Sequence, residues 1–344
     1  MNDRPAVLVT GGAGYIGSHC CRALLAAGYL PVVYDNFSTG HRSFVTGALV
    51  TGDLRDRAKL AQAFAQHDIV AVMHFAASSL VGESVADPRK YYTNNLAGTL
   101  SLLDAMREAG CRRLVFSSTG AVYGNADSKA LPEAYPCEPI NPYGASKWMI
   151  ERVLKDFRSA YGLGSFALRY FNASGADASG SIGELREPET HLIPRAMMAL
   201  QGHVSDFAVF GDDYDTPDGT AIRDYIHVTD LATAHVLAVR LLMQGHCGGV
   251  FNLGTGNGFS VREILAAIAA ETGRAVPHAI KPRRPGDPAY LVADASAARE
   301  TLQFSAKHSD LATIVRTAWA WHQKAHPLKA DEPVRIDADL SPAA

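Results

Sequence analysis

The sequence predicts an α/β fold with a doubly wound parallel sheet, and three patterns support this. Short apolar runs rich in branched residues alternate with segments of helical spacing. A glycine-rich turn follows the first of these runs, and loop-forming residues become frequent after about residue 172. Alternation of this kind places helices on both faces of a parallel sheet. The expected strands are Ala6–Thr10, Leu30–Tyr34, Ile69–His74, Leu114–Ser117 and Ser165–Arg169, separated by helical segments such as His19–Ala27 and Arg57–Ala65.

Two longer helices are expected in the middle of the chain. After Asp87-Pro88, apolar residues recur at three- and four-residue steps until Gly110, which predicts one amphipathic helix with a glycine stop. Asn141-Pro142 then supplies a cap and a first-turn proline for a second helix, which ends near Tyr161-Gly162.

Length and composition indicate two lobes. The chain has 344 residues, of which 47% are apolar, whereas one domain usually contains roughly 100 to 200 residues. We expect a cofactor-binding domain over residues 1–172 with return segments near 224–255, a smaller, loop-rich C-terminal substrate lobe over 173–325, and a mobile tail over 326–344. Within the return segments, Asp224–Val228 and Val250–Leu253 look like strands that rejoin the first sheet.

Charge and cysteine content argue against several classes of protein. The formal net charge of −3 provides no basic field that would concentrate nucleic acid or an anionic membrane surface. The five cysteines are odd in number and lack Cys-x-x-Cys spacing, so neither a disulfide framework nor a metal site is predicted. We find no export signal and no apolar run near the roughly 18 residues of a spanning helix. These features predict a cytoplasmic protein.

The turn after the first strand has the composition of a dinucleotide site. Gly11, Gly14 and Gly17 lie between Ala6–Thr10 and a helix, where the missing Cβ permits a tight turn and close approach of a pyrophosphate. The helix that follows directs its amide dipoles at the anion. The spacing is Gly-x-x-Gly-x-x-Gly, so the pattern alone would also suit a turn without a ligand.

Asp35 favours the cofactor over the empty turn. It follows Gly17 by 18 residues, close to the offset of about 20 expected for the carboxylate that binds an adenosine ribose. A carboxylate there repels a 2′-phosphate, so the predicted cofactor is NAD and not NADP, and the fold is of the Rossmann type. Asp53, at the end of the third strand, could reach the adenine amine or equally cap the helix from Arg55 onward.

Tyr143 and Lys147 form a candidate acid–base pair. They are four residues apart on the second long helix, so their side chains share one face. An ammonium and an oxidised nicotinamide both favour the phenolate form of a tyrosine, which then becomes a usable base. Alone, such a pair would be an ordinary exposed helical contact. Thr119, just after the strand Leu114–Ser117, could bridge a substrate oxygen and Tyr143.

Several further segments occur in a fixed order along the chain. They are Thr10–His19, Asp35–Ser38, His74–Ala77, Tyr92–Asn95, Ser117–Thr119, Asn141–Lys147, Arg169–Asn172, Asp218–Thr220 with Arg223–His227, and Arg284–Asp287. From about residue 6 to 320, the chain resembles the UDP-glucose 4-epimerase family of extended short-chain dehydrogenases/reductases. This resemblance implies interconversion of UDP-glucose and UDP-galactose by transient oxidation at sugar C4. Hydride passes to tightly bound NAD and returns to the opposite face of a rotated 4-ketose.

The resemblance also implies roles for individual residues. Tyr143 would take the proton of the sugar 4-hydroxyl, Lys147 would bind the nicotinamide ribose, and Thr119 would orient the hydroxyl. The residues placed around NAD are Gly11, Gly14, Tyr15, Ile16, Gly17, Asp35, Asn36, Ser38, Asp53, Leu54, Phe75, Ala76, Ala77, Asn94, Ser117, Tyr143, Lys147 and Tyr170. Those placed around the UDP-sugar are Thr119, Tyr143, Asn172, His191, Leu192, Phe210, Arg223, Tyr225, Arg284, Asp287 and Leu291.

Two positions depart from the family pattern. Ser79 stands where many of these enzymes have a lysine near the nicotinamide, so part of the electrostatic contact with NAD is missing or comes from another residue. Leu291 stands where side-chain bulk admits or refuses a 2-acetamido group. Leucine is intermediate in size, so 4-epimerisation of UDP-N-acetylhexosamines or UDP-pentoses stays open as an alternative.

Two other classes of function fit the sequence less well. Related 4,6-dehydratases carry an Asp-Glu pair directly after the threonine, and decarboxylases a nearby Glu, whereas this chain has Gly120 and Ala121. A non-catalytic NAD-binding regulator would not need Thr119, Tyr143 and Lys147 together. The family resemblance further implies a homodimer joined through the helices over 87–110 and 142–161. It is compatible with galactose metabolism and equally with the supply of surface polysaccharide precursors.

Overall fold

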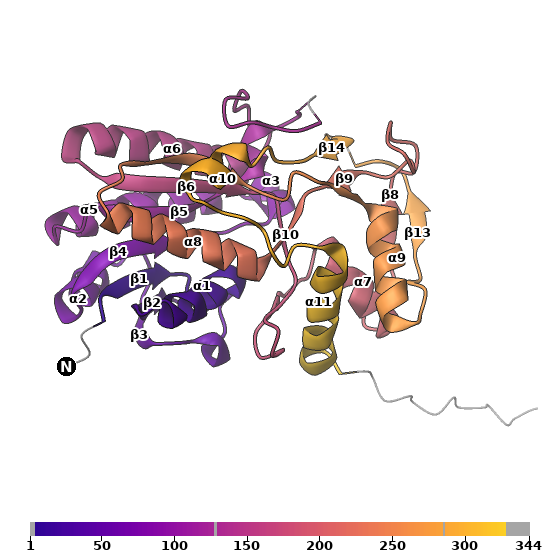
Figure 1. Cartoon of the computed structure of the whole chain (residues 1–344), viewed down its shortest axis with the longest axis horizontal. Coiled ribbons are helices and arrows are strands. Elements are labelled where there is room, and N and C mark those ends of the chain that lie inside the picture. The colour runs from indigo at the N-terminus through magenta and orange to yellow at the C-terminus, as the bar shows by residue number, and fades with distance from the viewer. Residues whose placement is uncertain (1–3, 127–128, 285, 328–344) are drawn as a thin grey trace, which may run out of the picture.

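A seven-stranded parallel sheet organises the structure, a computed structural model that describes residues 4–126, 129–284 and 286–327 (Figure 1). The strand order is β11-β6-β5-β4-β1-β2-β3. The strands are β1 (Ala6–Thr10), β2 (Leu30–Asp35), β3 (Ala48–Thr51), β4 (Ile69–His74), β5 (Arg113–Thr119), β6 (Gly164–Tyr170) and β11 (Gly248–Leu253). All neighbouring pairs in this sheet run parallel. The predicted Rossmann-type doubly wound sheet is confirmed.

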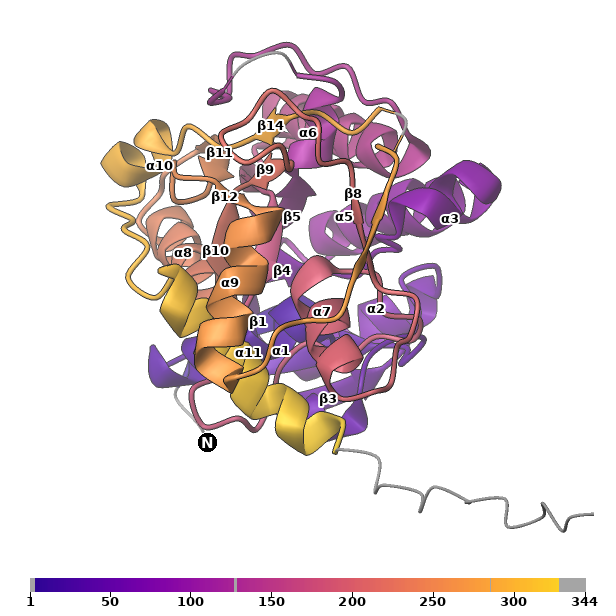
Figure 2. The same ribbon diagram turned by 90° about the vertical axis from the view of Figure 1, so that its right-hand side faces the viewer.

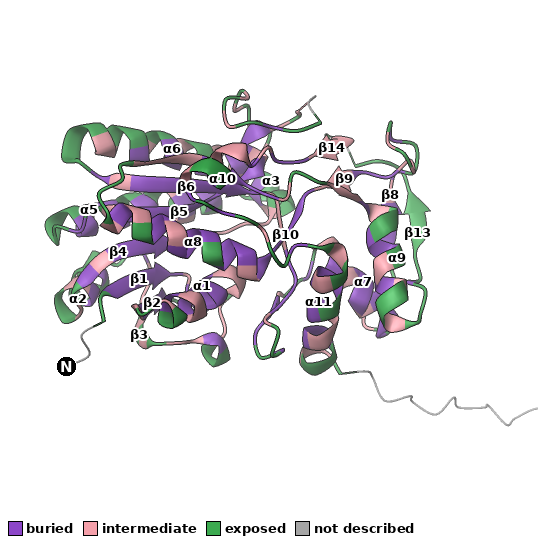
Figure 3. Cartoon of the chain, in the orientation of Figure 1, coloured by how far each residue is buried: buried purple, intermediate pink, exposed green. Residues whose placement is uncertain are grey.

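Helices cover both faces of the sheet. Successive side chains of a strand point to opposite faces, so the apolar strands present buried side chains to both layers of helices. Val7 and Val9 of β1 pack with helices α1 (Tyr15–Ala26) and α8 (Val228–Met243). Ala6 and Leu8 pack on the other face with helices α2 (Arg57–Gln66), α5 (Gly98–Glu108) and α6 (Pro142–Tyr161). Figure 3 shows the resulting pattern, with buried strands in the middle and exposed residues concentrated on the outer sides of the helices.

The strand order reverses between β1 and β4, which are neighbours in the sheet although β2 and β3 separate them in sequence. In open α/β sheets, this point opens a crevice at the carboxyl ends of the strands, where ligands bind. The glycine turn follows β1 there. Gly11 has φ +72°, and a Cβ on it would lie 2.7 Å from the backbone nitrogen of Ala76, directly after β4. Glycine is therefore required where the two strand ends meet.

The second long helix forms as predicted. Helix α6 begins after Asn141, whose side chain accepts the N–H of Gly144 at 2.9 Å. It ends before Gly162, which has the left-handed conformation with φ +68°. The cap and the glycine stop read from the sequence therefore define both ends of the helix that carries Tyr143 and Lys147.

The first long helix is not one regular α-helix. It consists of α4 (Pro88–Tyr91), the π-helical segment η2 (Tyr92–Ala97) and α5. Within η2, the Asn95 side chain is buried and donates to the Ser78 carbonyl at 3.0 Å and to Ser146 Oγ at 3.1 Å. The prediction of a single amphipathic helix was therefore wrong in this segment, where a wider turn accommodates a buried polar side chain.

The chain after β6 adds a second group of short strands and helices at one end of the sheet. Three small sheets pair β7 (Asn172–Ser174) with β10 (Tyr225–His227), β8 (Ala208–Phe210) with β13 (Ala279–Lys281), and β9 (Ile222–Arg223) with β12 (Phe259–Ser260) and β14 (Tyr290–Leu291). Helices α7 (Leu192–Leu200), α9 (Val261–Thr272) and α11 (Leu311–Ala325) pack around an apolar cluster of their own (Figure 2). The shorter elements are η1 (Arg42–Phe44), α3 (Val81–Ala86), η3 (Gly120–Tyr123) and α10 (Ser296–Thr301).

The two expected return strands differ in where they pair. Strand β11 joins the central sheet beside β6, as predicted. Strand β10 pairs instead with β7 in a separate two-stranded sheet, so the expectation that both rejoin the first sheet was wrong. Because β11 occupies the edge of the central sheet beside β6, β10 pairs with β7, the short strand that follows β6 in the chain. The division into domains at residue 172 stays a prediction.

Two further expectations concern the ends of segments. Helix α1 begins at Tyr15, directly after the glycine turn, and not near His19. Of the predicted tail over 326–344, residues 328–344 lie outside the described part of the chain.

Among the described residues, no helix combines the length and the apolar character that crossing a membrane requires.

Candidate functional site

The glycine turn forms an uncapped helix N-terminus at the crevice. The N-cap of α1 is Gly14, so among the described residues no side chain accepts a hydrogen bond from the N-terminal amides of α1. The first turn of α1 also contains no acidic residue. A helix N-terminus attracts an anion because its first amides lack carbonyl partners. A Cβ at Gly17 would lie 2.2 Å from the Gly11 carbonyl oxygen, so the glycines let α1 approach the turn closely. This geometry fits the pyrophosphate of a dinucleotide.

Asp35 is held directly behind this turn. Its buried carboxylate accepts the backbone N–H of Ala13 at 3.0 Å and that of Phe37 at 2.8 Å. These two hydrogen bonds from backbone amides fix the carboxylate at the end of β2. The adenosine ribose of a cofactor bound at the turn would lie there. Ser38 follows in the same loop and donates its N–H to Asn36 Oδ1 at 3.0 Å.

Asp53 does not cap the next helix. The N-cap of α2 is Asp56, which accepts the N–H of Lys59 at 3.0 Å, so that alternative for Asp53 was wrong. Asp53 Oδ2 instead accepts from Asn36 Nδ2 at 3.0 Å, and Oδ1 accepts from Arg55 Nε at 2.7 Å. The hydrogen bonds with Arg55 hold the pKa of Asp53 well below its usual range. Asp53 therefore lies beside the loop from β2, next to Asn36.

The remaining residues predicted around the cofactor come from the ends of neighbouring elements. The N–H groups of Phe75 and Ala76 both donate to the Thr10 carbonyl, at 2.9 and 3.1 Å, which joins the ends of β4 and β1. Asn94, on η2, donates to Ser78 Oγ at 3.3 Å. The Ser117 and Tyr170 hydroxyls are hydrogen-bonded between β5 and β6. Ala77 follows Ala76, the Tyr15 hydroxyl donates to the Gly175 carbonyl at 2.6 Å, and Ile16 and Leu54 pack in the apolar clusters of opposite sheet faces.

Tyr143, Thr119 and Lys147 meet at the carboxyl end of β5. The Thr119 side chain lies close enough to Tyr143 to lower the pKa of its hydroxyl, and Thr119 Oγ1 accepts the N–H of Ala121 at 3.1 Å. Lys147 is buried, donates from Nζ to the Ser117 carbonyl at 2.8 Å and lies 4.8 Å from the centroid of the Phe116 ring. The structure thus brings together the three residues that the sequence proposed as catalytic.

The pKa values in this group follow from burial. Burial raises the pKa of Tyr143, while the polar Thr119 side chain and the positive charge of Arg186 act in the opposite direction. Burial lowers the pKa of Lys147 to about 7, against the attraction of Glu151. Burial therefore disfavours the charged form of both side chains. Sequence reasoning found Lys147 but missed Arg186, since no motif marks it.

The residues predicted around the UDP-sugar lie on the small sheets. Arg223 of β9 forms an ion pair with Asp287, and Leu291 is the residue opposite Arg223 in the β14–β9 pair. The guanidinium carbon of Arg284 lies 4.0 Å above the Phe210 ring. Asn172 begins β7, Tyr225 is buried in β10, and Leu192 is the first residue of α7. Arg223, Asp287 and Leu291 thus form one group, and Arg284 with Phe210 another.

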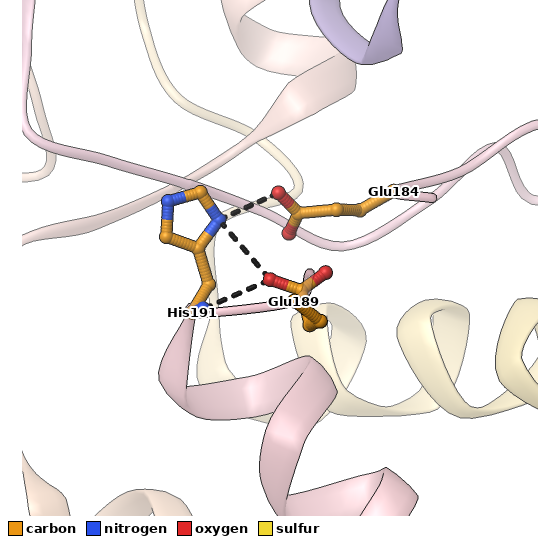
Figure 4. A group of neighbouring side chains, drawn as sticks. All are labelled: Glu184, Glu189 and His191. Atoms are coloured by element: carbon orange, nitrogen blue, oxygen red, sulfur yellow. Dashed lines mark hydrogen bonds and ion pairs between the residues drawn. The ribbon is translucent and has the colours of Figure 1, made fainter. Parts of the chain in front are cut away.

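His191, predicted to contact substrate, belongs to a charged cluster (Figure 4). Its Nδ1 lies 2.6 Å from Glu184 Oε1 and 3.8 Å from Glu189 Oε1. Glu189 Oε1 also accepts the backbone N–H groups of Thr190 and His191, and Arg186 Nε lies 3.3 Å from Glu184. The Glu184 carboxylate raises the pKa of His191 against the effect of burial. Sequence reasoning missed both glutamates, although Glu184 and Glu189 precede His191 within one short loop.

This cluster has the donor atoms of a metal site. Its three ligand atoms lie within 4.8 Å of one another. Each carboxylate already has positively charged or N–H partners within the protein, so the cluster is neutralised by its own residues. Its geometry gives no reason to place a metal there, and the expectation that the protein has no metal site stays a prediction.

Comparison with known proteins identifies close relatives. The model of the NAD dependent epimerase/dehydratase family matches residues 7–254. A UDP-glucose 4-epimerase of Rhizobium meliloti is 52% identical, over 92% of this chain and 97% of that protein. The crystal structure of UDP-glucose 4-epimerase from Brucella ovis in complex with NAD has a TM-score of 0.90 and 55% identity, covering 92% of this chain and 97% of that one. A Stenotrophomonas maltophila UDP-glucose 4-epimerase with bound NAD and formylated UDP-arabinopyranose has a TM-score of 0.91 and 42% identity, covering 94% and 99%.

Proposed function

Because the chain belongs to the NAD-dependent epimerase/dehydratase family, we propose that it interconverts UDP-glucose and UDP-galactose with NAD as its cofactor. It is an enzyme, an NAD-dependent nucleotide-sugar 4-epimerase. The observation that carries this conclusion is the meeting of Tyr143, Thr119 and Lys147 at the end of β5. The chain that holds them is 52% and 51% identical to UDP-glucose 4-epimerases of two Rhizobium species.

The protein's residues perform the proton transfer. Tyr143 takes the proton of the sugar 4-hydroxyl, and Thr119, which lies beside Tyr143, orients that hydroxyl. Lys147 contributes a positive charge that favours the phenolate. NAD, when bound, accepts the hydride of sugar C4 and returns it. After the 4-keto sugar has rotated, the hydride would return to the opposite face of C4 while Tyr143 gives the proton back to the C4 oxygen, so one residue serves as base and as acid.

The diphosphate and the uridine are held at the small sheets. Arg223 and Arg284 would bind the diphosphate, because guanidinium groups match phosphate oxygens through paired N–H donors. Arg223 is oriented by Asp287, and Arg284 by its contact with the Phe210 ring. Asn172, His191, Leu192 and Tyr225 would complete this pocket. The sugar can rotate only if these contacts hold the nucleotide while the ring is free.

The cofactor residues act through fixed geometry. The glycine turn and α1 would hold the pyrophosphate, and Asp35 the adenosine ribose, which excludes a 2′-phosphate. Asn36, Asp53 and Leu54 would lie at the adenine. Phe75, Ala76, Ala77, Asn94, Ser117 and Tyr170 would surround the nicotinamide half.

We also propose a cytoplasmic homodimer that acts in galactose metabolism. The dimer is supported by large apolar side chains that are exposed on the helices expected to pair. Trp148 and Tyr161 of α6 are 41% and 48% exposed, and Leu100 of α5 is 38% exposed. A Trp148→Glu variant should lower the molar mass in light scattering to that of one chain, and an unchanged dimer would remove α6 from the interface.

The range of sugars is the main alternative. The relative from Stenotrophomonas maltophila was crystallised with a UDP-arabinopyranose derivative, and Leu291 lies opposite Arg223. Incubation with UDP-galactose, UDP-N-acetylgalactosamine and UDP-arabinose in turn, without added cofactor, followed by chromatography, tests both readings. UDP-glucose formed from UDP-galactose supports the proposal. A 4-keto-6-deoxy product would instead indicate a dehydratase, although Gly120 and Ala121 of η3 offer no acid for that elimination.

A further inference from the structure

A buried ion pair lies one turn beyond Lys147 on α6. Glu151 accepts from Arg169 of β6 through both oxygens, with Nε to Oε1 at 2.9 Å and Nη2 to Oε2 at 2.5 Å. Each of the two side chains is only 5% exposed. Ser118 of β5 donates its hydroxyl to Glu151 Oε1 at 2.5 Å. Three hydrogen bonds from two strands therefore hold the Glu151 carboxylate in one position.

The partners of Glu151 are also well fixed. Arg169 Nη1 donates to the Tyr123 hydroxyl at 2.9 Å, and that hydroxyl donates to Asn252 Oδ1 at 2.7 Å. The network thus joins α6, β5, β6, η3 and β11. A buried ion pair is costly to desolvate and is weak support for stability by itself, because apolar residues of similar volume often do as well. Stability alone therefore does not explain why an ion pair is buried at this place.

Every member of the central group adjoins a residue of the proposed site. Lys147 precedes Glu151 by four residues, so both lie on one face of α6. Ser118 is followed by Thr119 in β5, and Arg169 is followed by Tyr170 in β6. The ion pair consequently connects α6, which carries Tyr143 and Lys147, to the carboxyl ends of β5 and β6.

The groups around Lys147 come from α6, β5 and β4. On α6 itself, Tyr143 and Glu151 lie on its face, and Glu151 is the carboxylate that acts on Lys147 among the described residues. From β5, the Ser117 carbonyl and the Phe116 ring contact the ammonium. From β4, His74 faces it, but burial and then the Lys147 charge lower the pKa of His74 to about 3, so His74 is neutral.

We propose that Glu151 is a positioning residue of the epimerase reaction, and that its carboxylate, held by Arg169 and Ser118, keeps the buried Lys147 ammonium charged. A charged Lys147 in turn keeps Tyr143 able to give up its proton. This inference deepens the proposed function and rests on it.

The direction of the effect follows from the charges. Burial lowers the pKa of Lys147 to about 7, and Glu151 opposes that shift. Without the carboxylate, the pKa of Lys147 falls further, so Lys147 loses its proton at a lower pH than in the wild type. Above that pKa, each unit of downward shift reduces the charged fraction about tenfold.

The test compares Glu151→Gln with Glu151→Asp and with Leu154→Ala in the NAD-loaded enzyme. Glu151→Gln removes the charge and nearly keeps the shape, Glu151→Asp restores a charge, and Leu154→Ala damages the same buried helix face without changing any charge. We expect the alkaline limb of kcat to move to lower pH in Glu151→Gln, with KM for UDP-galactose changed less than twofold. Glu151→Asp should recover most of the alkaline activity, and Leu154→Ala should lower stability but leave the limb in place.

Glu151→Gln leaves Arg169 without its carboxylate and could unfold the protein for that reason alone. The double variant Glu151→Gln/Arg169→Met removes both charges and should restore stability, while the alkaline limb stays shifted. An alkaline limb equal to that of the wild type in both variants, or an equal shift in Leu154→Ala, would overturn the proposal.

A second measurement separates this inference from the proposed function. The ultraviolet difference absorbance of tyrosinate, with Tyr143→Phe as the reference, reports the Tyr143 proton directly in NAD-loaded protein. We expect the pKa of Tyr143 to be higher in Glu151→Gln than in the wild type, because the ammonium is lost. If the wild type does not epimerise any UDP-sugar, the proposed function fails while this titration still decides the role of Glu151. An unchanged or lower Tyr143 pKa overturns that role.

Discussion

Lys147 donates from α6 to the backbone carbonyl of Ser117, 2.8 Å away, at the end of β5. This contact ties the helix of the candidate acid–base pair to the strand that carries Thr119. The lysine is buried and is held by backbone, not by a mobile side chain. The positions of Tyr143, Thr119 and Lys147 relative to one another are therefore set by how α6 packs on β5.

Replacing Tyr143 by phenylalanine should remove the base and leave the fold intact. Positioned acid–base catalysis typically contributes roughly 10² to 10⁴ in rate, so kcat for UDP-galactose should fall by that factor. Bound NAD, measured by absorbance after denaturation, should stay at the wild-type level. Tyr161→Phe is the matched control, because Tyr161 lies at the exposed end of the same helix. Near-normal turnover in Tyr143→Phe would exclude this residue as the base.

Replacing Asp35 by alanine should weaken the preference for NAD over NADP. The carboxylate is fixed at the end of β2 by the N–H groups of Ala13 and Phe37, and its charge repels a 2′-phosphate. Fluorescence titration of cofactor-free protein with each dinucleotide measures the ratio of the two Kd values. Asp56→Ala is the control: it should lower the free energy of unfolding by about 1 kcal/mol through loss of a helix cap. An unchanged Kd ratio in Asp35→Ala would refute the ribose assignment.

Replacing Arg186 by glutamine should shift the pH dependence of turnover. The Arg186 charge lowers the pKa of Tyr143, against the larger effect of burial. Without it, the pKa of Tyr143 rises, so the active phenolate forms only at higher pH. The acid limb of kcat should therefore move to higher pH. Arg195→Gln serves as the control, since Arg195 pairs with Asp206. A limb that moves to lower pH or stays in place would show that Arg186 does not act on Tyr143.

Replacing Leu291 by serine should widen the range of sugars. Leu291 lies on β14 opposite Arg223 of β9. Arg223 is one of the two arginines proposed to bind the diphosphate. A smaller side chain leaves room for a 2-acetamido group, and pocket changes of this size are usually worth roughly 10- to 200-fold in discrimination. The ratio of kcat/KM for UDP-N-acetylgalactosamine to that for UDP-galactose should rise within that range. A constant ratio would place the sugar selectivity elsewhere.

Local sequence signals predicted the elements that carry the site. The alternation of apolar runs located five strands of the central sheet, and Asn141 and Gly162 located both ends of α6. These features are encoded within a few residues, because caps and strand periodicity are local. Asp35 was likewise predicted from a local signal, its spacing from the glycine turn.

Features that depend on tertiary contacts were not predictable in this way. The π-helical segment η2 reflects the bonds of Asn95 to Ser78 and Ser146, which are distant in sequence. The pairing of β10 with β7 depends on which strand occupies the edge beside β6. No local pattern pairs Glu151 with Arg169, and only the packing of α6 on β6 brings them together. The same holds for Arg186, which acts on Tyr143 from the loop between β7 and α7.

The central claim is that a hydride leaves sugar C4, stays within the protein and returns to the same carbon. UDP-galactose carrying deuterium at C4, incubated with the enzyme in ordinary water, tests it most directly. The account predicts that the UDP-glucose formed retains the deuterium at C4, as read by mass spectrometry and proton NMR. Loss of the label to solvent would contradict it.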